Sequence, residues 1–446
     1  MGSVAAALRE RGFTVTGSDA NIYPPMSTFL AKKGIALTEG YRAENIPTDA
    51  DVIVIGNAMT RGNPEVEAVL NLRLYYLALP EVLKQFFLRS RKNLVVTGTH
   101  GKTTTASLLA WIMKSAGLEP SYMIGGIPKN LGQGACFNDS KYFVIEGDEY
   151  DTAFFDKRSK FIHYLPELLI VNNIEFDHAD IFPDLDAIKL TFRRLINIVP
   201  QNGMLLLNGD DPNCVEVAQK SLAPIVEVGF SKNCARRIRD VSYLPGSSQF
   251  TLEAERFAVP LIGEFNVRNA AMAISAAEFY QVPVDKIRTA LASFQGVSRR
   301  QEIRGEVRGV KVIDDFGHHP TAITETLTAL RQRYPGHRIW AIFEPRSNTT
   351  RRAIFQRELP DALGLADGVF LSEVARLDQI PVEERLRPEV VIETIAATGK
   401  PAFYEKNADA ILHRLVPLLQ ERDIVVVFSN GGFDGIHGKL LTQLAS

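Results

Sequence analysis

The sequence predicts an α/β protein built from parallel sheets, and three observations support this prediction. Short apolar, β-branched runs such as DVIVIG (51–56) alternate with helical patterns through most of the chain, which is the rhythm of parallel strands joined by helices. The length of 446 residues is typical of about three domains. Hydrophobic residues make up 46% and charged residues 23%, as is ordinary for a globular protein.

Composition and charge exclude several classes of protein. The net charge is −2, so we expect no basic surface for nucleic acid or for an anionic membrane. No apolar run approaches the ~20 residues of a membrane helix, and no signal peptide opens the chain. The three cysteines, Cys136, Cys214 and Cys234, lie far apart and form no Cys-x-x-Cys pair. We therefore expect a cytoplasmic protein without a structural zinc site.

The first unit is predicted over residues 1–90 and has half of a nucleotide-binding sheet. A helix over 2–11 is followed by a strand over 13–17, and a second strand over 51–56 leads to a helix from Pro64. Sheets of this type start with a strand and a glycine-rich turn before the first helix. We therefore expect roughly one strand and one loop to be missing at the start of this unit.

Two further α/β units are predicted, over 91–300 and 301–446. The second unit also has alternating stretches near 241–260, which predict a small antiparallel addition, and an Ala-rich helix over 266–280. The strands expected in these two units are 93–98, 142–146, 168–172, 204–207, 225–228, 310–314, 338–343, 368–371 and 423–428.

A phosphate-binding loop is predicted after the first strand of the second unit. Residues 94–105 read LVVTGTHGKTTT, and a helix is expected over 106–115. Glycines let backbone N–H groups turn toward phosphate oxygens, and a helix N-terminus adds positive potential. We expect Lys102 to reach the β- and γ-phosphates of ATP and the Thr103 hydroxyl to ligate Mg²⁺. The alternative is a chance glycine turn before a helix. The nucleotide-binding residues expected here are Gly98, Thr99, His100, Gly101, Lys102, Thr103 and Thr104.

An acidic cluster follows the strand 142–146. The run EGDEYD (146–151) holds four acids in six residues, which repel one another unless cations are bound. A carboxylate at the carboxyl end of a parallel strand faces the crevice where ligands bind. We therefore expect Glu146 to be a Mg²⁺ ligand, since that ion prefers hard oxygens. A solvated acidic turn is the alternative.

A histidine follows the next strand, in the run NIEFDHAD (173–180). A lone histidine is usually structural, but His178 lies between two aspartates in the same predicted crevice. We expect it to ligate a metal and to form the catalytic set with Lys102 and Glu146. Two metals would bridge the γ-phosphate of ATP and a substrate carboxylate, because phosphoryl transfer mainly requires charge neutralisation and alignment.

These motifs resemble those of the Mur ligase family, and the resemblance covers nearly the whole chain. It implies a three-domain architecture, with a UDP-sugar-binding domain, a central ATP-binding domain of P-loop type and a C-terminal Rossmann-like domain for the amine substrate. It also implies an ATP-dependent ligase that joins a carboxylate to an amine through an acyl-phosphate. The stretches that carry the resemblance are GTHGKTT (98–104), Glu146, Asp177-His178, EFNVRNAA (264–271), SRR (298–300) and DDFGHHP (314–320).

The resemblance also assigns three residues of the nucleotide site. It implies that Asn269 contacts the adenine, that Arg300 lies on the γ-phosphate side and that Asp315 contacts the ribose. Taken alone, each of these residue types is more often structural at such positions.

Two branches of the family are similar to this chain. One adds L-alanine to UDP-N-acetylmuramate, and the other adds the tripeptide L-alanyl-γ-D-glutamyl-meso-diaminopimelate to the same nucleotide sugar in murein recycling. Several stretches look like the tripeptide-adding branch, which makes UDP-N-acetylmuramate and the murein tripeptide the expected substrates. An L-alanine ligase and a catalytically silent relative remain the alternatives. The stretches are GNAMTRGNP (56–64), YDTAFFDKRS (150–159), EPRSNT (344–349) and SNGGFDGIH (429–437).

Substrate-binding residues are expected in these stretches and at strand ends. Arg346, at a strand end in the third unit, is suited to hold a peptide carboxylate as a bidentate fork. Lys157, Arg158 and Lys160 offer cations for an acidic ligand, or else form a solvated basic loop. The expected substrate-binding residues are Ser18, Asp19, Asn57, Arg346 and Asn430.

The helix after His178 predicts no carbamylated lysine. Some Mur ligases carry one at the position where Phe192 or Arg193 stands here, and Lys189 lies about one helical turn too early. We expect the electron density of a crystal grown with bicarbonate to show an unmodified Lys189. Density for a carbamate on its Nζ would contradict this prediction.

Overall fold

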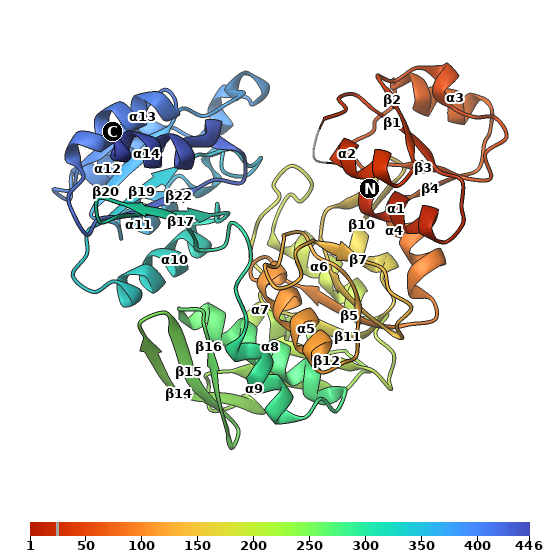
Figure 1. Cartoon of the computed structure of the whole chain (residues 1–446), viewed down its shortest axis with the longest axis horizontal. Coiled ribbons are helices and arrows are strands. Elements are labelled where there is room, and N and C mark those ends of the chain that lie inside the picture. The colour runs from red at the N-terminus through yellow and green to blue at the C-terminus, as the bar shows by residue number, and fades with distance from the viewer. Residues whose placement is uncertain (24–25) are drawn as a thin grey trace.

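The computed structural model describes residues 1–23 and 26–446, which fold into three α/β domains (Figure 1). The N-terminal and C-terminal domains form two separate lobes, and the central domain lies between and below them in this view. The largest sheets are mainly parallel, so the predicted fold class is confirmed. Within the described ranges, no helix is both long and apolar enough to cross a membrane.

The described strands of the N-terminal domain form two separate two-stranded parallel sheets, β1 with β2 and β3 with β4. Strand β1 begins later than the predicted 13–17, and Phe13, which lies before it, packs edge-to-face on Phe86 with ring centroids 5.4 Å apart. Ser18 and Asp19 therefore lie within β1 instead of after it. The elements are α1 (Gly2–Glu10), β1 (Thr16–Asp19), α2 (Met26–Lys32), β2 (Ala36–Glu39), η1 (Ala43–Asn45), β3 (Ile53–Ile55), α3 (Pro64–Asn71), β4 (Tyr76–Ala78), α4 (Leu79–Leu83) and the π-helix η2 (Lys84–Leu88).

The central domain is built on a ten-stranded sheet with the order β16-β15-β14-β13-β12-β11-β5-β8-β6-β7 in the described chain. Apolar residues of α5, α8 and α9 pack on one face, and those of α4, α6 and α7 pack on the other. The predicted antiparallel addition is confirmed as β14, β15 and β16. The first elements are β5 (Lys92–Thr97), α5 (Lys102–Ser115), β6 (Ser121–Met123), β7 (Ala135–Cys136), β8 (Tyr142–Glu146), β9 (Asp151–Ala153), β10 (Asp156–Ser159), η3 (Lys160–His163) and β11 (Pro166–Val171). The others are α6 (Leu185–Ile196), β12 (Met204–Asn208), α7 (Pro212–Ala218), β13 (Ile225–Gly229), β14 (Arg236–Leu244), β15 (Ser247–Leu252), β16 (Glu255–Val259), α8 (Glu264–Phe279) and α9 (Val284–Ala292).

The C-terminal domain has a six-stranded sheet with the order β17-β18-β22-β19-β20-β21, in which only β17 is antiparallel to its neighbour. Strand β17 was not predicted, because its residues are mostly polar and partly exposed. The first elements are β17 (Glu302–Val307), β18 (Val310–Asp315), α10 (Pro320–Arg333), β19 (Ile339–Phe343), η4 (Ala353–Phe355), α11 (Glu358–Leu363) and β20 (Gly368–Ser372). The others are η5 (Leu377–Gln379), η6 (Val382–Glu384), α12 (Pro388–Ala396), β21 (Ala402–Glu405), α13 (Ala408–Leu415), η7 (Val416–Leu418), β22 (Ile424–Phe428), η8 (Phe433–Gly435) and α14 (Ile436–Ala445).

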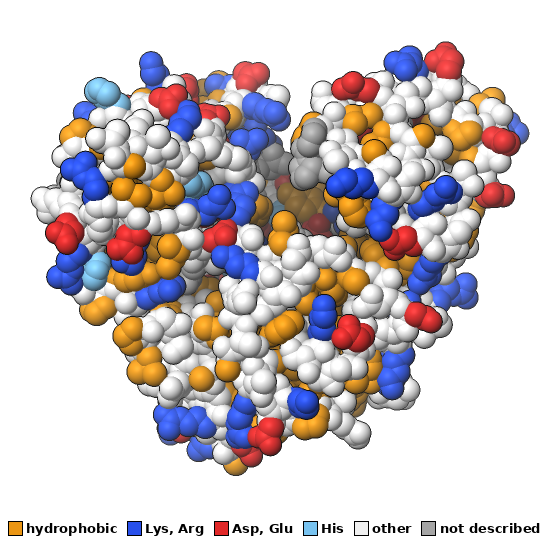
Figure 2. Space-filling model, in the orientation of Figure 1, with side chains coloured by type: hydrophobic (Ala, Val, Ile, Leu, Met, Phe, Trp, Pro, Cys, Tyr) orange, Lys and Arg blue, Asp and Glu red, His pale blue; other side chains and the backbone are white. Residues whose placement is uncertain are grey.

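The register of three neighbouring strands brings the predicted motifs to one edge of the central sheet. Strand β5 lies between β8 and β11, with Glu146 opposite Val96 and Val171 opposite Thr97. The loops that follow these parallel strands therefore leave from the same edge. The space-filling view shows a hollow between the two lobes, above the central domain (Figure 2).

Candidate active site

Two glycines give the loop between β5 and α5 its shape. Gly98 and Gly101 have φ angles of +125° and +77°, which side chains rarely adopt. A Cβ on Gly98 would lie 2.9 Å from the backbone nitrogen of Asn173, and one on Gly101 would lie 2.5 Å from Asn269 Oδ1. The left-handed Gly101 also lets α5 begin at Lys102, earlier than the predicted residue 106. The backbone thus makes a closely packed turn at a helix N-terminus, a position that favours bound phosphate.

Lys102 points back into this loop and binds a carboxylate. Its Nζ donates to the carbonyl oxygen of Gly98 at 2.7 Å and to both oxygens of Glu149 at 3.0 and 2.9 Å. Glu149 Oε1 also lies 3.1 Å from His178 Nε2. A single buried carboxylate therefore joins the lysine of the loop to the histidine predicted to ligate a metal. The sequence prediction chose Glu146 from the acidic run and missed Glu149.

Neighbouring carboxylates control the protonation of both cationic groups. Burial alone would lower the pKa of Lys102, but the charges of Glu149, Asp148 and Glu146 outweigh it and raise the pKa. Burial likewise opposes the charged form of His178, yet the hydrogen bond and charge of Glu149, with the charge of Asp177, raise its pKa. The site is therefore strongly anionic and favours bound cations.

The second part of the site surrounds the Thr103 hydroxyl. Thr103 Oγ1 donates to Glu146 Oε1 at 3.0 Å, and the Gly125 N–H donates to the other oxygen of Glu146 at 2.7 Å. Arg300 Nη2 donates to Thr103 Oγ1 at 3.4 Å. The structure thus brings Thr103, Glu146 and Arg300 together, while His178 and the neighbouring Lys102 meet at Glu149.

A cavity of about 470 Å³ is lined by residues of all three domains, and Lys102, Thr103, Glu146, His178 and Arg300 are among them, whereas Glu149 and Gly98 lie off its wall. Asn57 comes from the N-terminal domain, Asn269 from α8, and Asp315 from the end of β18. Asp315 accepts hydrogen bonds from the N–H groups of Gln301 and Gly317, and burial raises its pKa. The other predicted residues on the wall are Thr99, His100, Gly101, Lys102, Thr103, Thr104, Glu146, His178 and Arg300.

Four predicted substrate-binding residues lie off the cavity wall. Ser18 donates to Glu65 Oε2 at 2.5 Å, and Asp19 accepts from the Asn21 N–H at 3.3 Å. Arg346 and Asn430 follow the paired strands β19 and β22, so they share the carboxyl edge of the C-terminal sheet.

Arg346 and Asn430 both retain hydrogen-bonding capacity at this edge. The guanidinium of Arg346 lies 3.4 Å from Glu344 and is half exposed. Asn430 Oδ1 is buried and has no hydrogen-bond partner among the described residues.

The basic residues of the β9–β10 hairpin are already paired. Lys157 lies 2.5 Å from Asp151, Arg158 lies 2.8 Å from Asp156, and Lys160 lies 2.9 Å from Asp148. Lys157 and Arg158 are largely exposed in these pairs, and Lys160 lines the cavity. That this run offers cations for an acidic ligand, instead of forming a solvated basic loop, stays a prediction. The acids that neutralise it belong to the same stretch of sequence, where charge counting could have found them.

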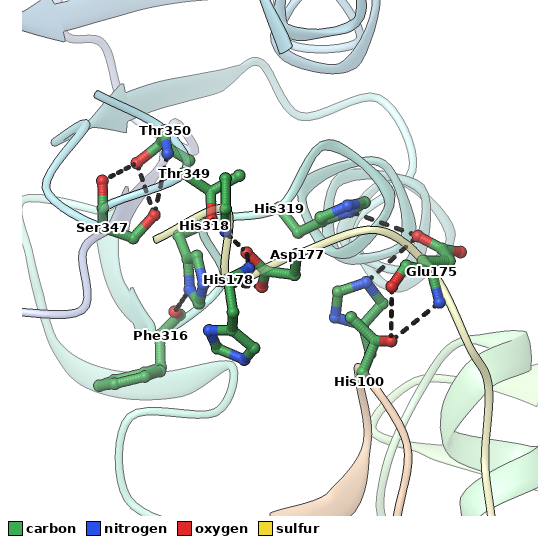
Figure 3. Close-up of polar contacts among 12 residues, drawn as sticks. His100, Glu175, Asp177, His178, Phe316, His318, His319, Ser347, Thr349 and Thr350 are labelled. Atoms are coloured by element: carbon green, nitrogen blue, oxygen red, sulfur yellow. Dashed lines mark hydrogen bonds and ion pairs between the residues drawn. The ribbon is translucent and has the colours of Figure 1, made fainter. Parts of the chain in front are cut away.

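A group of residues that the sequence prediction did not bring together connects the central and C-terminal domains (Figure 3). Ligand atoms of His100, Glu175 and His319 lie within 4.8 Å of one another, a spacing that also suits a metal ion. However, His319 Nε2 bonds the carbonyl of Phe176 at 3.2 Å, and its Nδ1 accepts from the Thr321 N–H at 3.2 Å. Because both of its nitrogens are used, we interpret the group as a hydrogen-bonded contact between domains.

Lys189, the residue considered for carbamylation, points away from this site. Its Nζ lies 2.7 Å from Glu216 on α7, and neither residue lines the cavity. The absence of a carbamate stays a prediction.

Comparison with known proteins gives the family. Residues 1–91 match the Mur ligase family catalytic domain, 96–277 the Mur ligase middle domain and 299–431 the Mur ligase glutamate ligase domain. The chain is 44% identical over its full length to the UDP-N-acetylmuramate–L-alanyl-γ-D-glutamyl-meso-2,6-diaminoheptandioate ligase of Escherichia coli K12, covering 96% of that protein. This chain belongs to the Mur ligase family.

Two further relatives represent the tripeptide-adding and alanine-adding branches of the family. A murein peptide ligase from Psychrobacter arcticus 273-4, solved by crystallography, is 37% identical and has a TM-score of 0.72, with 100% of this chain and 96% of that chain covered. The UDP-N-acetylmuramate–L-alanine ligase of Myxococcus xanthus is 31% identical, with 100% of this chain and 93% of that protein covered.

We predict that Lys102→Ala lowers kcat at least about a hundredfold, as loss of a preorganised charge-stabilising donor does. The buried Glu149 would lose one cationic partner and keep His178, so the variant should remain folded with a reduced melting temperature. Steady-state phosphate release and circular dichroism measure both effects. A folded variant with kcat within about threefold of the unmodified enzyme would refute the phosphate-site assignment.

The second prediction concerns Glu325 on α10, which faces the central domain. Burial raises its pKa from 4.5 to about 7, opposed by His100 and Arg268 and reinforced by Glu175 and Glu264. Because the pKa of Glu325 is higher in the folded state, folding is favoured while the carboxyl is protonated. The contribution to the free energy of unfolding is fully present below pH 4.5 and is lost as the pH rises through about 7.

At pH 8 the Glu325→Gln variant should therefore unfold at a higher urea concentration than the unmodified Mur ligase. Its free energy of unfolding should be larger by up to about 3 kcal/mol. The advantage should shrink as the pH falls toward 4.5. An equal difference at both pH values would show that protonation of Glu325 is not its cause.

Proposed function

We propose that this Mur ligase joins the tripeptide L-alanyl-γ-D-glutamyl-meso-diaminopimelate to UDP-N-acetylmuramate, with ATP, in murein recycling. The observation that carries the chemistry is that Lys102, His178, Thr103 and Glu146 line one cavity, while the buried Glu149 joins Lys102 to His178. The choice of amine is supported by 44% identity to a ligase named for this tripeptide, against 31% to one named for L-alanine.

The three domains divide the work in this proposal. Residues 1–90 bind the UDP sugar, 91–300 bind ATP, and 301–446 bind the amine substrate. Among the predicted substrate-binding residues of the first domain, Asn57 lines the shared cavity. The carboxylate to be activated therefore enters from that side.

The residues present fit ATP and Mg²⁺. The two glycines with positive φ shape a turn at a helix N-terminus, a position that favours phosphate, and Asn269, Arg300 and Asp315 line the same cavity. Thr103 and Glu146 offer hard oxygens 3.0 Å apart, and His178 adds a nitrogen beside the anionic Glu149. Mg²⁺ held by Thr103, Glu146 and His178 would neutralise phosphate charge.

The chain's own groups then carry the reaction. ATP supplies a phosphoryl group to the lactyl carboxylate of the muramate, and the alanyl amine displaces phosphate from the acyl-phosphate to form the amide. Lys102, kept cationic by its carboxylate neighbours, stabilises the charge that develops on the transferred group. Walls from three domains limit the access of water, which would hydrolyse the activated carboxylate.

The C-terminal domain distinguishes the two possible amines. A site for free L-alanine must hold the α-carboxylate beside the reacting centre. In the tripeptide this group is an amide, and the charged groups lie further out. Arg346 and Asn430, at the sheet edge and off the cavity wall, suit the tripeptide.

The direct test is phosphate release with ATP, UDP-N-acetylmuramate and either amine. We expect release with the tripeptide to be much faster than release with L-alanine. Release with L-alanine alone would place the chain in the alanine-adding branch. No release with either amine would favour a catalytically silent relative.

Arg346→Ala is expected to lower kcat/KM for the tripeptide about ten- to a hundredfold, the value of a charge-assisted pair of about 1.5–3 kcal/mol. Remote contacts of this kind supply binding energy that positions the amine. Arg414→Ala is the matched control, because Arg414 is equally exposed, pairs with one glutamate and lies in the same domain. Equal effects of the two substitutions would remove Arg346 from the site.

A further inference from the structure

The backbone of His178 adopts a strained conformation that contacts from its own loop and from another domain hold together. It has a φ of +55°, in the left-handed region that costs a residue with a Cβ about 1–2 kcal/mol. Its carbonyl accepts from the N–H groups of Ile181 and Phe182 at 2.9 and 3.0 Å. Such strained residues persist when the surrounding structure fixes them.

The His178 N–H donates to Asp177 Oδ1 at 2.7 Å within the loop, and further contacts come from another domain. The Thr349 hydroxyl donates to Asp177 Oδ1 at 2.7 Å and accepts from the Ala179 N–H at 3.3 Å. These are the residues directly before and after His178. The hydroxyl thus donates one hydrogen bond to the residue before His178 and accepts one from the residue after it (Figure 3). Thr349 and Asp177 are both buried.

Two neighbouring contacts strengthen the same connection. Asn348 donates to Asp180 at 2.8 Å, and His318 Nε2 lies 3.5 Å from the second oxygen of Asp177. On its other side, His178 meets Glu149 at 3.1 Å and the Tyr150 ring at a centroid distance of 4.2 Å. The imidazole therefore sits between the central-domain acids and a backbone clamped by the C-terminal domain.

We propose that Thr349 is a positioning residue: its hydroxyl fixes the backbone on both sides of His178 and so sets the imidazole for metal binding. The inference deepens the proposed function, on which the role of His178 rests. Thr349 lies three residues after Arg346 in the same loop. The loop that should hold the peptide therefore also orients a metal ligand. Docking of the C-terminal domain would then complete the metal site, because the clamp exists only when the domains are in contact.

The test is Mn²⁺ binding to the full-length protein, measured by the EPR signal of free Mn²⁺, which needs no turnover. Thr349→Val keeps the shape and removes the hydroxyl, and it should raise the Mn²⁺ dissociation constant about five- to twentyfold. Thr349→Ser restores the hydroxyl and should return the constant to within about twofold of the unmodified protein. His178→Ala gives the loss expected when the ligand itself is absent.

Thr350→Val is the matched control, because Thr350 is the next residue, is also buried and, in the described chain, bonds through its hydroxyl only to Ser347 of its own loop. Its Mn²⁺ affinity should match that of the unmodified protein. Equal affinities for Thr349→Val and Thr350→Val, or no rescue by serine, would overturn the inference. So would an unchanged affinity in His178→Ala.

A second variant covers the case in which Thr349→Val fails to fold. Asn348→Ala removes the exposed contact to Asp180 and should raise the Mn²⁺ dissociation constant about two- to fivefold; no change would overturn the inference. Phosphate release provides the separate check on function. Its absence in the unmodified protein would refute the proposed activity, while the Mn²⁺ measurements would still decide the role of Thr349.

Discussion

The buried carboxylate of Glu149 accepts a hydrogen bond from the ammonium group of Lys102 and also contacts the imidazole of His178. The rest of the site depends on this interaction, because it connects the loops that follow three parallel strands. An isolated buried carboxylate is costly, and a paired one tolerates the loss of a partner poorly. The pairing therefore keeps Lys102 charged and places it near the three groups proposed to hold Mg²⁺.

The charge cluster also explains why three domains are needed. The central domain supplies the phosphate loop, the acids and, at its end, Arg300, but Asp315 reaches the cavity from the start of the C-terminal domain. The N-terminal domain closes the opposite wall with Asn57. The loop that carries His178 is clamped by Thr349 from a sheet that begins more than a hundred residues later in the sequence. A ligase that must shield an acyl-phosphate from water gains from walls that meet only when the domains are in contact.

Local chemistry made much of this arrangement predictable from the sequence. The apolar strands, the Gly98–Thr104 loop and the residues at strand ends are set by short-range patterns and by the rule that parallel strands share a carboxyl edge. Thr103 and Glu146 lie together as those patterns imply, and Arg300, which the family resemblance alone assigned to the site, lies beside Thr103. The partner of Lys102 was not predictable, because four acids follow β8 and only the fold selects Glu149. The same holds for Thr349 and His319, whose contacts cross between domains and leave no periodic signal. Polar edge strands such as β17 were missed because they bury too little to show a pattern.

The central claim is that these charges activate a carboxylate by phosphorylation. The most direct measurement uses UDP-N-acetylmuramate labelled with ¹⁸O in its lactyl carboxylate, together with ATP, Mg²⁺ and the tripeptide, and follows the label by mass spectrometry. If an acyl-phosphate forms, one labelled oxygen leaves with the phosphate when the amine attacks, so the released phosphate carries ¹⁸O and the amide keeps the other atom. Amide product accompanied by unlabelled phosphate would contradict the account.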